Sequence, residues 1–230
     1  MNIVEYKAIQ ASAKAVLSAL PEYIDSRATE QTIAAKAVEL LVEHGISQTW
    51  YHGVSALVLL GSRSCLSISG RDYEPYGESV GNVNVVTVDL SPSRKNIWGD
   101  CARSFFVEDG HCSAVPTHTE FVRGYEAQIA LHQAMMGFVT PATKFSELYA
   151  YGNALIEALG FENLDFLNNL GHSIETNLSD RRFIDENAHD RLGEARFFTF
   201  EPHISQVGHQ WGFKHENIYY FDQTGSVCEL

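Results

Sequence analysis

The chain has 230 residues, of which 45% are hydrophobic and 20% charged, so it is long enough to bury a complete core. Its formal net charge is −13, with 16 Lys and Arg against 29 Asp and Glu. This balance argues against nucleic acid and anionic membranes as partners. Apolar runs are shorter than a membrane span, and residues 1–7 do not resemble a signal sequence. We therefore expect a cytoplasmic protein with reduced cysteines.

Two helices are predicted at the start of the chain. The first has apolar residues at helical spacing and stops before Pro21, namely Ile9, Ala13, Val16 and Leu20. The second stops at Gly45, and its apolar face comprises Ile33, Ala37, Leu40 and Leu41. Neither helix contains a group of residues suited to catalysis, so we expect both to serve packing.

Residues 50–107 change to a strand pattern. Three apolar runs indicate strands, and they cover residues 56–60, 83–90 and 102–107. A loop rich in glycine and proline covers 69–81, and Ser-Pro-Ser at 91–93 is predicted to form a turn. Asp89 and Asp100 then belong to neighbouring antiparallel strands, close enough to bind a common group.

A second helix pair is predicted after Pro116. The residues that indicate a long helix are Phe121, Val122, Tyr125, Ile129, His132 and Met136. Residues 140–143 break it, and a further helix contains Leu148, Ala154, Leu155 and Leu159. The order of helix pair, strands, helix pair and strands predicts two similar halves, each with helices over one face of a curved sheet.

Short motifs surround five residues that can bind metal, and these are Asp89, Asp100, His172, Glu201 and Glu216. Taken singly, each such residue is more often solvated or hydrogen-bonded. Together they suit a pair of divalent cations, because carboxylates can bridge two ions and the imidazole adds a nitrogen. An acid on a half-buried strand also needs a partner or a metal. The sequence therefore predicts a dinuclear metal site.

The order and spacing of these residues resemble the creatinase, methionine aminopeptidase and prolidase superfamily of pita-bread metallohydrolases. The two aspartates are eleven residues apart, and residues 99–105 read Gly-Asp-Cys-Ala-Arg-Ser-Phe, similar to the family's Gly-Asp-x-x-Arg-[Thr/Ser]-Phe. Gly171-His172 resembles its Gly-His pair, and residues 199–202 resemble its Thr-x-Glu-Pro motif. Its last motif, Gly-x-[Arg]-x-Glu, is similar to Gly-Phe-Lys-His-Glu at 212–216.

This resemblance implies an α+β pita-bread fold with a curved antiparallel sheet, two helix pairs and pseudo-twofold halves. We expect one domain over residues 1–230, without the separate N-terminal domain of larger members. The resemblance also implies two divalent ions at the five residues (manganese, cobalt, iron or zinc) and a proton relay by Glu201. The implied activity is that of an Xaa-Pro dipeptidase or aminopeptidase acting on a small peptide or amide, in a homodimer.

The sequence departs from the family's peptidases at two further histidines that stabilise the developing oxyanion. It has no histidine between Gly53 and Asp100, and the residue seven positions after His172 is Ser179. The candidate catalytic substitutes are His52, His203 and His209. Candidate anchors for a substrate carboxylate are Arg71, Arg103, Arg181, Arg182 and Tyr76.

Three functions therefore stay open. The first is the peptidase. The second is non-peptidase chemistry on a small molecule at the same dinuclear site, either C–N hydrolysis or elimination by a lyase. The third is a non-catalytic binding module, against which the complete set of five ligand residues argues.

Overall fold

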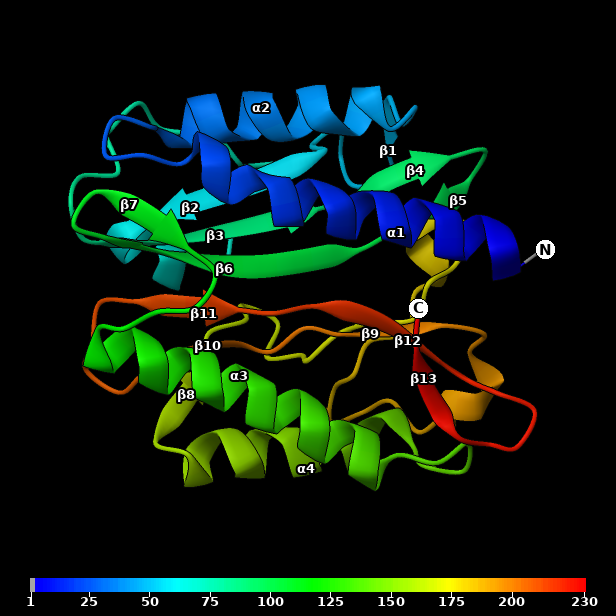
Figure 1. Cartoon of the computed structure of the whole chain (residues 1–230). Helices are drawn as coiled ribbons and strands as arrows, with labels where there is room; N and C mark the ends of the chain where they lie inside the picture. Colours follow the sequence, from blue (N-terminus) through cyan, green and yellow to red (C-terminus); the bar gives the residue numbers. More distant parts are fainter. Residues whose placement is uncertain (1–2) are drawn as a thin grey trace.

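The N-terminal half of the chain packs two helices and a short 3₁₀ turn against a four-stranded antiparallel sheet (Figure 1). A computed structural model describes residues 3–230. The helical segments are α1 Ile3–Ala19, η1 Leu20–Tyr23 and α2 Glu30–Glu43. The sheet has the order β2 Ala56–Leu60, β3 Asn84–Leu90, β6 Cys101–Glu108 and β7 His111–Ser113. All eight apolar residues predicted to face the core from these helices are buried.

The C-terminal half repeats this plan with a second helix pair, α3 Thr119–Phe138 and α4 Phe145–Ala158. One sheet contains β11 Gly212–Lys214, β10 His203–Gln206 and β8 Phe161–Asn163. The other contains β13 Val227–Glu229, β12 Asn217–Phe221 and β9 Phe198–Phe200. Three 3₁₀ turns complete the chain, η2 Gly61–Cys65, η3 Leu178–Asp180 and η4 Leu192–Glu194. The expected α+β arrangement of two helix-and-sheet halves is confirmed.

One local expectation was wrong. Residues 91–93 do not form a turn, because Pro92 and Ser93 belong to β4 Pro92–Arg94, which pairs with β1 Gln48–Thr49 and β5 Ile97–Trp98. The turn lies at Lys95 and Asn96, whose φ angles are 53° and 62°. In α3, Met136 is exposed and Met135 is buried. The buried face of that helix passes through Gly124, which leaves room for the ring of Phe213.

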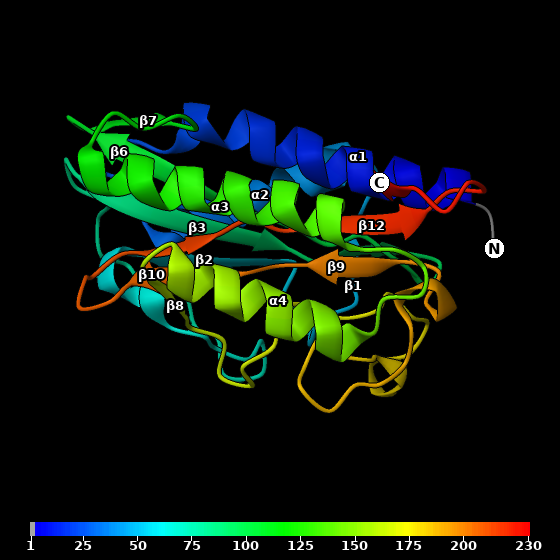
Figure 2. The ribbon, with the colours of Figure 1, turned by 90° about the horizontal axis from the view of Figure 1, so that it is seen from below.

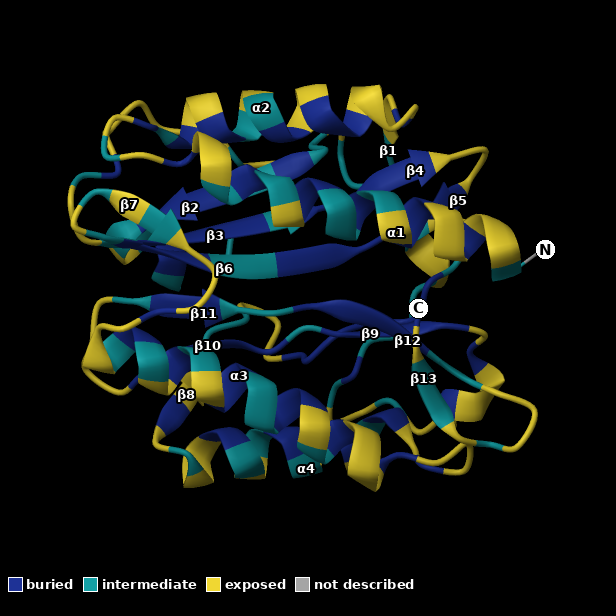
Figure 3. Ribbon diagram, in the orientation of Figure 1, coloured by how far each residue is buried: buried dark blue, intermediate teal, exposed yellow. Residues whose placement is uncertain are grey.

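The core consists of two hydrophobic clusters, one built mainly from each half. Each cluster also includes residues of the other half: Ile174, Phe197, Ile218 and Leu230 belong to the first, and Val85 and Phe106 belong to the second. Figure 3 shows most strands buried and the outward helix faces exposed, whereas β7 and β13 are partly exposed. Seen from below in Figure 2, the long loops gather on one side of the strands, away from α1 and α3. Over residues 3–230, no helix is both long and apolar enough to cross a membrane.

The two halves join edge to edge along β6 and the β11–β12 segment. The backbone N–H of Glu216 donates to the carbonyl of Ala102 at 3.0 Å. The backbone N–H of Lys214 donates to Ser104 Oγ at 2.8 Å. The strands of both halves therefore form one curved surface across the join.

Gly212 tests how closely this join is packed. A Cβ atom at this position would lie 2.0 Å from the backbone oxygen of Ser64. We expect Gly212→Ala to lower the free energy of unfolding by about 1–3 kcal/mol, as overpacking does, measured by urea unfolding. The control is Gly137→Ala, because Gly137 lies exposed in α3 with nothing near its Cβ position. A Gly212→Ala protein as stable as the control would contradict the packing described here.

Candidate metal centre

Pairing across four strands brings three acidic residues into one row. Asp89 on β3 lies opposite Ala102 on β6, and Ala102 forms a bridge with Glu216. The pairing of β12 with β9 places Glu201 opposite Glu216 one position further along. Residues opposite each other project from the same face of a sheet. The small side chain of Ala102 therefore leaves space into which the three carboxylates extend.

Asp100 and His172 reach the same space from its far side. Asp100 directly precedes β6 and is two residues before Ala102, so alternation puts it on the same face. His172 does not lie in a strand, but its backbone N–H donates to the side-chain Oγ1 of Thr199 in β9 at 3.0 Å. Its Nδ1 lies 2.9 Å from the carbonyl of Ser173. That contact turns Nε2 toward the carboxylates, 3.4 Å from Asp100 Oδ2 and 3.9 Å from Glu201 Oε1.

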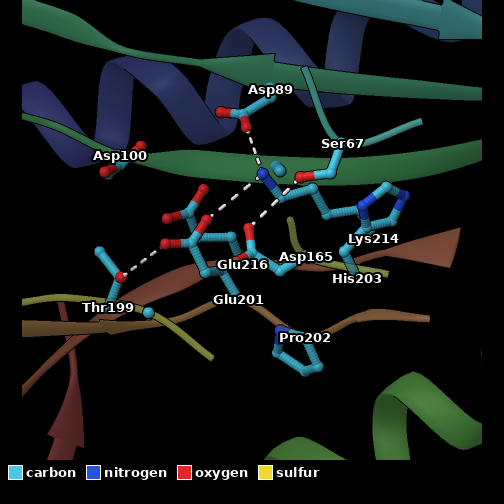
Figure 4. Close-up of polar contacts among 12 residues, drawn as sticks. Ser67, Asp89, Asp100, Asp165, Thr199, Glu201, Pro202, His203, Lys214 and Glu216 are labelled. Carbon is cyan, nitrogen blue, oxygen red and sulfur yellow. Dashed lines mark hydrogen bonds and ion pairs between the residues drawn. The ribbon is translucent and has the colours of Figure 1, made fainter. Parts of the chain in front are cut away.

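The side chain of a lysine that the motifs did not indicate also enters this space. Lys214 is two residues before Glu216, and it pairs with His203 on β10. Its Nζ lies 2.5 Å from Asp89 Oδ2 and 3.3 Å from Glu201 Oε2 (Figure 4). The structure therefore brings together all five residues predicted as metal ligands, and it adds one ammonium group.

The donor set fits a divalent cation. Glu216 is 1% exposed, and neither of its carboxyl oxygens has a hydrogen-bond partner within residues 3–230. A buried carboxylate without a partner is costly. Asp89, Glu201 and Glu216 each offer an oxygen within 4.8 Å of the others. An ion held by carboxylates and one imidazole would supply the partner that Glu216 lacks.

Burial and mutual charge shift the titration of these groups. Burial raises the pKa of Asp100 to about 7 and raises the pKa of Glu216 well above its usual range. Burial also acts to raise the pKa of Glu201, but the charges of Lys214 and His172 hold it below its usual value. For His172, burial acts to lower the pKa, and its bond to Asp100 with the charge of Glu201 raises it overall.

Four of the five residues, Asp89, Asp100, His172 and Glu201, line a cavity of about 430 Å³, and Glu216 lies outside its lining. Loops around residues 50–52, 66–72, 165–169 and 181–183 form its walls. A volume at the small end of the range for ligand pockets suits a small substrate.

Of the three histidines predicted to assist catalysis, two line this cavity. His203 is buried, its Nε2 lies 2.6 Å from the carbonyl of Ser64, and burial lowers its pKa to about 4. His52 has a left-handed backbone with φ of 48°, and burial together with the charge of Arg71 lowers its pKa. His209 does not line the cavity, and its Nδ1 lies 2.9 Å from Glu120 Oε1. We assign it no catalytic role.

Two residues at the cavity were not singled out from the sequence. The ring of Trp50 stacks on Trp98 and meets His172 edge-on at 5.5 Å between centroids. Asp165 accepts a hydrogen bond from Ser67 at 3.3 Å, and burial raises its pKa. The Trp-Tyr-His-Gly sequence at 50–53 could have indicated Trp50 as a cavity residue. Nothing in the sequence around Asp165 distinguished it from an acidic residue at the surface.

Comparison with protein families gives a match over residues 5–223, to the group described as metallopeptidase family M24. The chain belongs to this family. The match covers nearly the whole sequence and confirms the superfamily inferred from the motifs. Comparison with curated proteins gives no significant match.

Solved structures share the fold of this M24 chain at low sequence identity. The X-Pro aminopeptidase of Thermotoga maritima matches with a TM-score of 0.81 at 17% identity, over 99% of this chain and 60% of that one. The prolidase of Pyrococcus furiosus gives 0.79 at 18% identity, over 98% and 62%. The methionine aminopeptidase of the same Thermotoga species gives 0.78 at 15%, over 97% and 93%. The chain thus spans about three fifths of the first two, and the likeness confirms the pita-bread fold.

The lone carboxylate of Glu216 generates a stability prediction. A carboxyl pKa that is raised on folding stabilises the folded protein below the unfolded pKa, and this contribution is lost as pH rises through the folded pKa. Glu216→Gln removes that loss. We expect the free energy of unfolding of the metal-free variant to exceed that of wild type by about 1–3 kcal/mol between pH 5 and pH 9. Urea unfolding in the presence of chelator measures this difference.

The matched control is Glu157→Gln, because Glu157 is exposed on α4. Its free energy of unfolding should stay within about 0.5 kcal/mol of wild type, as is usual for an exposed substitution. Added manganese should stabilise the wild type more than the Glu216→Gln variant, because an ion that binds only the folded state stabilises it by mass action. Equal stabilisation of both proteins would remove Glu216 from the site.

Proposed function

We propose that this M24 chain is a metal-dependent hydrolase that cleaves an amide or peptide bond of a small substrate. The observation that supports this most directly is the unpartnered, buried carboxylate of Glu216 among four other potential ligands, beside a small cavity. Asp89, Asp100, His172, Glu201 and Glu216 would hold the metal. When bound, a divalent cation lowers the pKa of a water and polarises the substrate carbonyl.

The chain's own residues supply positioning and proton transfer. Glu201 lies at the cavity wall with its pKa held low, so its carboxylate is ionised and ready to accept a proton from the attacking water. The contact between His172 Nδ1 and the carbonyl of Ser173 fixes the ring and leaves Nε2 as a ligand. His52 and His203 line the cavity with lowered pKa values. They are neutral near pH 7, so each has a single ring N–H. The N–H of His52 can donate a hydrogen bond to a substrate oxygen, whereas the Nε2–H of His203 already donates to the carbonyl of Ser64. The free Nδ1 of His203 can therefore only accept a hydrogen bond from the substrate.

Arginines at the cavity favour a substrate with an anionic end. Of the five candidate anchors, Arg71 and Arg181 line the cavity, whereas Arg103, Arg182 and Tyr76 do not. The guanidinium of Arg181 packs over the rings of Trp50 and Phe183, at 5.4 and 5.1 Å from their centroids. Such packing pre-orients its donors. A dipeptide with a free carboxylate, as in the Xaa-Pro dipeptidase reading, fits this arrangement.

C–N hydrolysis or elimination on a non-peptide molecule is the second candidate. It is favoured by Ser179, which stands where the family's peptidases have a histidine, and by the position of His209 outside the cavity. A panel of dipeptides, dipeptide amides and small amides separates the two candidates. Turnover of small amides without turnover of any dipeptide would favour the second.

The homodimer, the cytoplasmic location and manganese as the metal stay predictions. Leu66, Phe166 and Leu167 are exposed at the cavity lining, and burial of these side chains by a second subunit would favour a dimer. Light scattering coupled to size-exclusion chromatography measures the mass, and elemental analysis of the purified protein identifies the metal.

Metal removal and one substitution test the proposed chemistry. Dialysis against chelator should abolish hydrolysis, and manganese, cobalt, iron or zinc should restore it. Glu201→Gln should lower kcat by about 100-fold or more, because the variant loses the proton acceptor, whereas Glu157→Gln should leave kcat unchanged. Hydrolysis that persists in chelator at the full rate would refute metal dependence.

Two consecutive arginines test the anionic end of the substrate. Arg181→Met should raise KM for a dipeptide by about 10- to 100-fold, the effect of losing a hydrogen bond to a charged group. The same change should leave KM for the corresponding dipeptide amide unaltered. Arg182→Met is the control, since Arg182 lies outside the cavity and pairs with Glu175 at 3.3 Å. Equal effects on dipeptide and amide would argue against a carboxylate anchor.

A further inference from the structure

Lys214 places a fixed cation inside the acidic cluster. Its backbone is held at the join by two hydrogen bonds with Ser104, N–H to Oγ at 2.8 Å and Oγ–H to the carbonyl at 3.1 Å. Its side chain is 18% exposed, and the ammonium lies between Asp89 and Glu201 (Figure 4). The strand thus directs this lysine into the cluster rather than toward solvent.

The two oxygens of the Glu201 carboxylate face different neighbours, Lys214 on one side of the cluster and His172 on the other. Its Oε2 faces Lys214 Nζ at 3.3 Å, and its Oε1 lies 3.9 Å from His172 Nε2. On the His172 side, Asp100 lies 3.4 Å from the same imidazole nitrogen. One side therefore offers a nitrogen and oxygens without a resident cation, whereas the other side already contains one.

The ammonium and a second metal ion would compete for the same oxygens. Lys214 Nζ is 2.5 Å from Asp89 Oδ2, and divalent ions bind carboxylate oxygens at about 2.0–2.2 Å. Each carboxylate keeps a second oxygen, but a divalent ion bound there would lie beside the ammonium and be repelled by its positive charge. Moving the ammonium away would leave Asp89 without its partner and would require Lys214 to find another partner or solvent.

We propose that Lys214 takes the place of a second metal ion, so that the centre binds one divalent cation tightly. Asp100, His172, Glu201 and Glu216 hold that ion, and Asp89 binds the ammonium instead. This inference rests on the metal-binding role proposed above, but it removes Asp89 from the five residues proposed there to hold metal. It replaces the two ions implied by family resemblance with one ion and one lysine.

The number of bound ions tests the proposal directly. Metal-free protein is titrated with manganese by calorimetry, and bound manganese is counted after gel filtration. Wild type should bind one ion per chain and give the electron paramagnetic resonance spectrum of an isolated ion. Lys214→Met should bind two ions and give the spectrum of a coupled pair. Its second site should be at least about 100-fold tighter than any second site in wild type.

Asp89→Asn provides a second, independent measurement. With Lys214 in place, this substitution should leave the count at one ion. In a two-ion centre that uses Asp89 as a ligand, the count would instead fall from two to one. The double variant with Lys214→Met should return to one ion, and Lys95→Met, at an exposed turn, should match wild type. Two ions in wild type, or one in Lys214→Met, would overturn the proposal.

The ion count and the hydrolytic activity, measured on the same protein, separate this proposal from the proposed function. One ion without amide hydrolysis would refute the function and leave the inference standing, whereas two ions with hydrolysis would do the reverse. No bound ion in wild type would refute both. If Lys214→Met alone fails to fold, the double variant removes both members of the pair, and the change in ion count from wild type to Asp89→Asn, none or a loss of one, still decides between one ion and two.

Discussion

The hydrogen bond from the Glu216 amide to the Ala102 carbonyl fixes the register in which the two halves of the molecule meet. This register lines up Asp89, Ala102, Glu216 and Glu201 across four strands. A shift by one residue would turn every one of the side chains on the moving strand to the opposite face of the sheet. The acidic cluster, the lysine within it and the cavity above them all depend on this alignment.

The sequence was most informative where local pattern and motif agreed. Helical spacing from Ile9 to Leu20 and from Ile33 to Leu41 predicted both N-terminal helices, and those residues are buried. The apolar runs at 83–90 and 102–107 predicted two neighbouring antiparallel strands, which are β3 and β6. Residues 91–93 were misread because Ser-Pro-Ser is typical of turns. Pro92 is nevertheless tolerated in β4, which pairs with both β1 and β5, because it is the first residue of the strand.

Tertiary contacts decided the features that sequence could not predict. Lys214 shares a strand face with Glu216 by simple alternation, but its approach to Asp89 depends on the pairing of two halves that lie far apart in the chain. His203 and His209 looked equivalent, both near Glu201. The first lies in β10 and points into the cavity, whereas the second follows the strand and pairs with Glu120 on α3.

The cluster draws its members from both halves, with Asp89 and Asp100 from one and His172, Glu201 and Glu216 from the other. Neither half alone contains a complete coordination shell. A cation held by these residues would connect the two halves, so its binding free energy would add to the free energy that holds the halves together. The contact between the halves thus positions the proposed metal site, and a bound ion would in turn stabilise that contact.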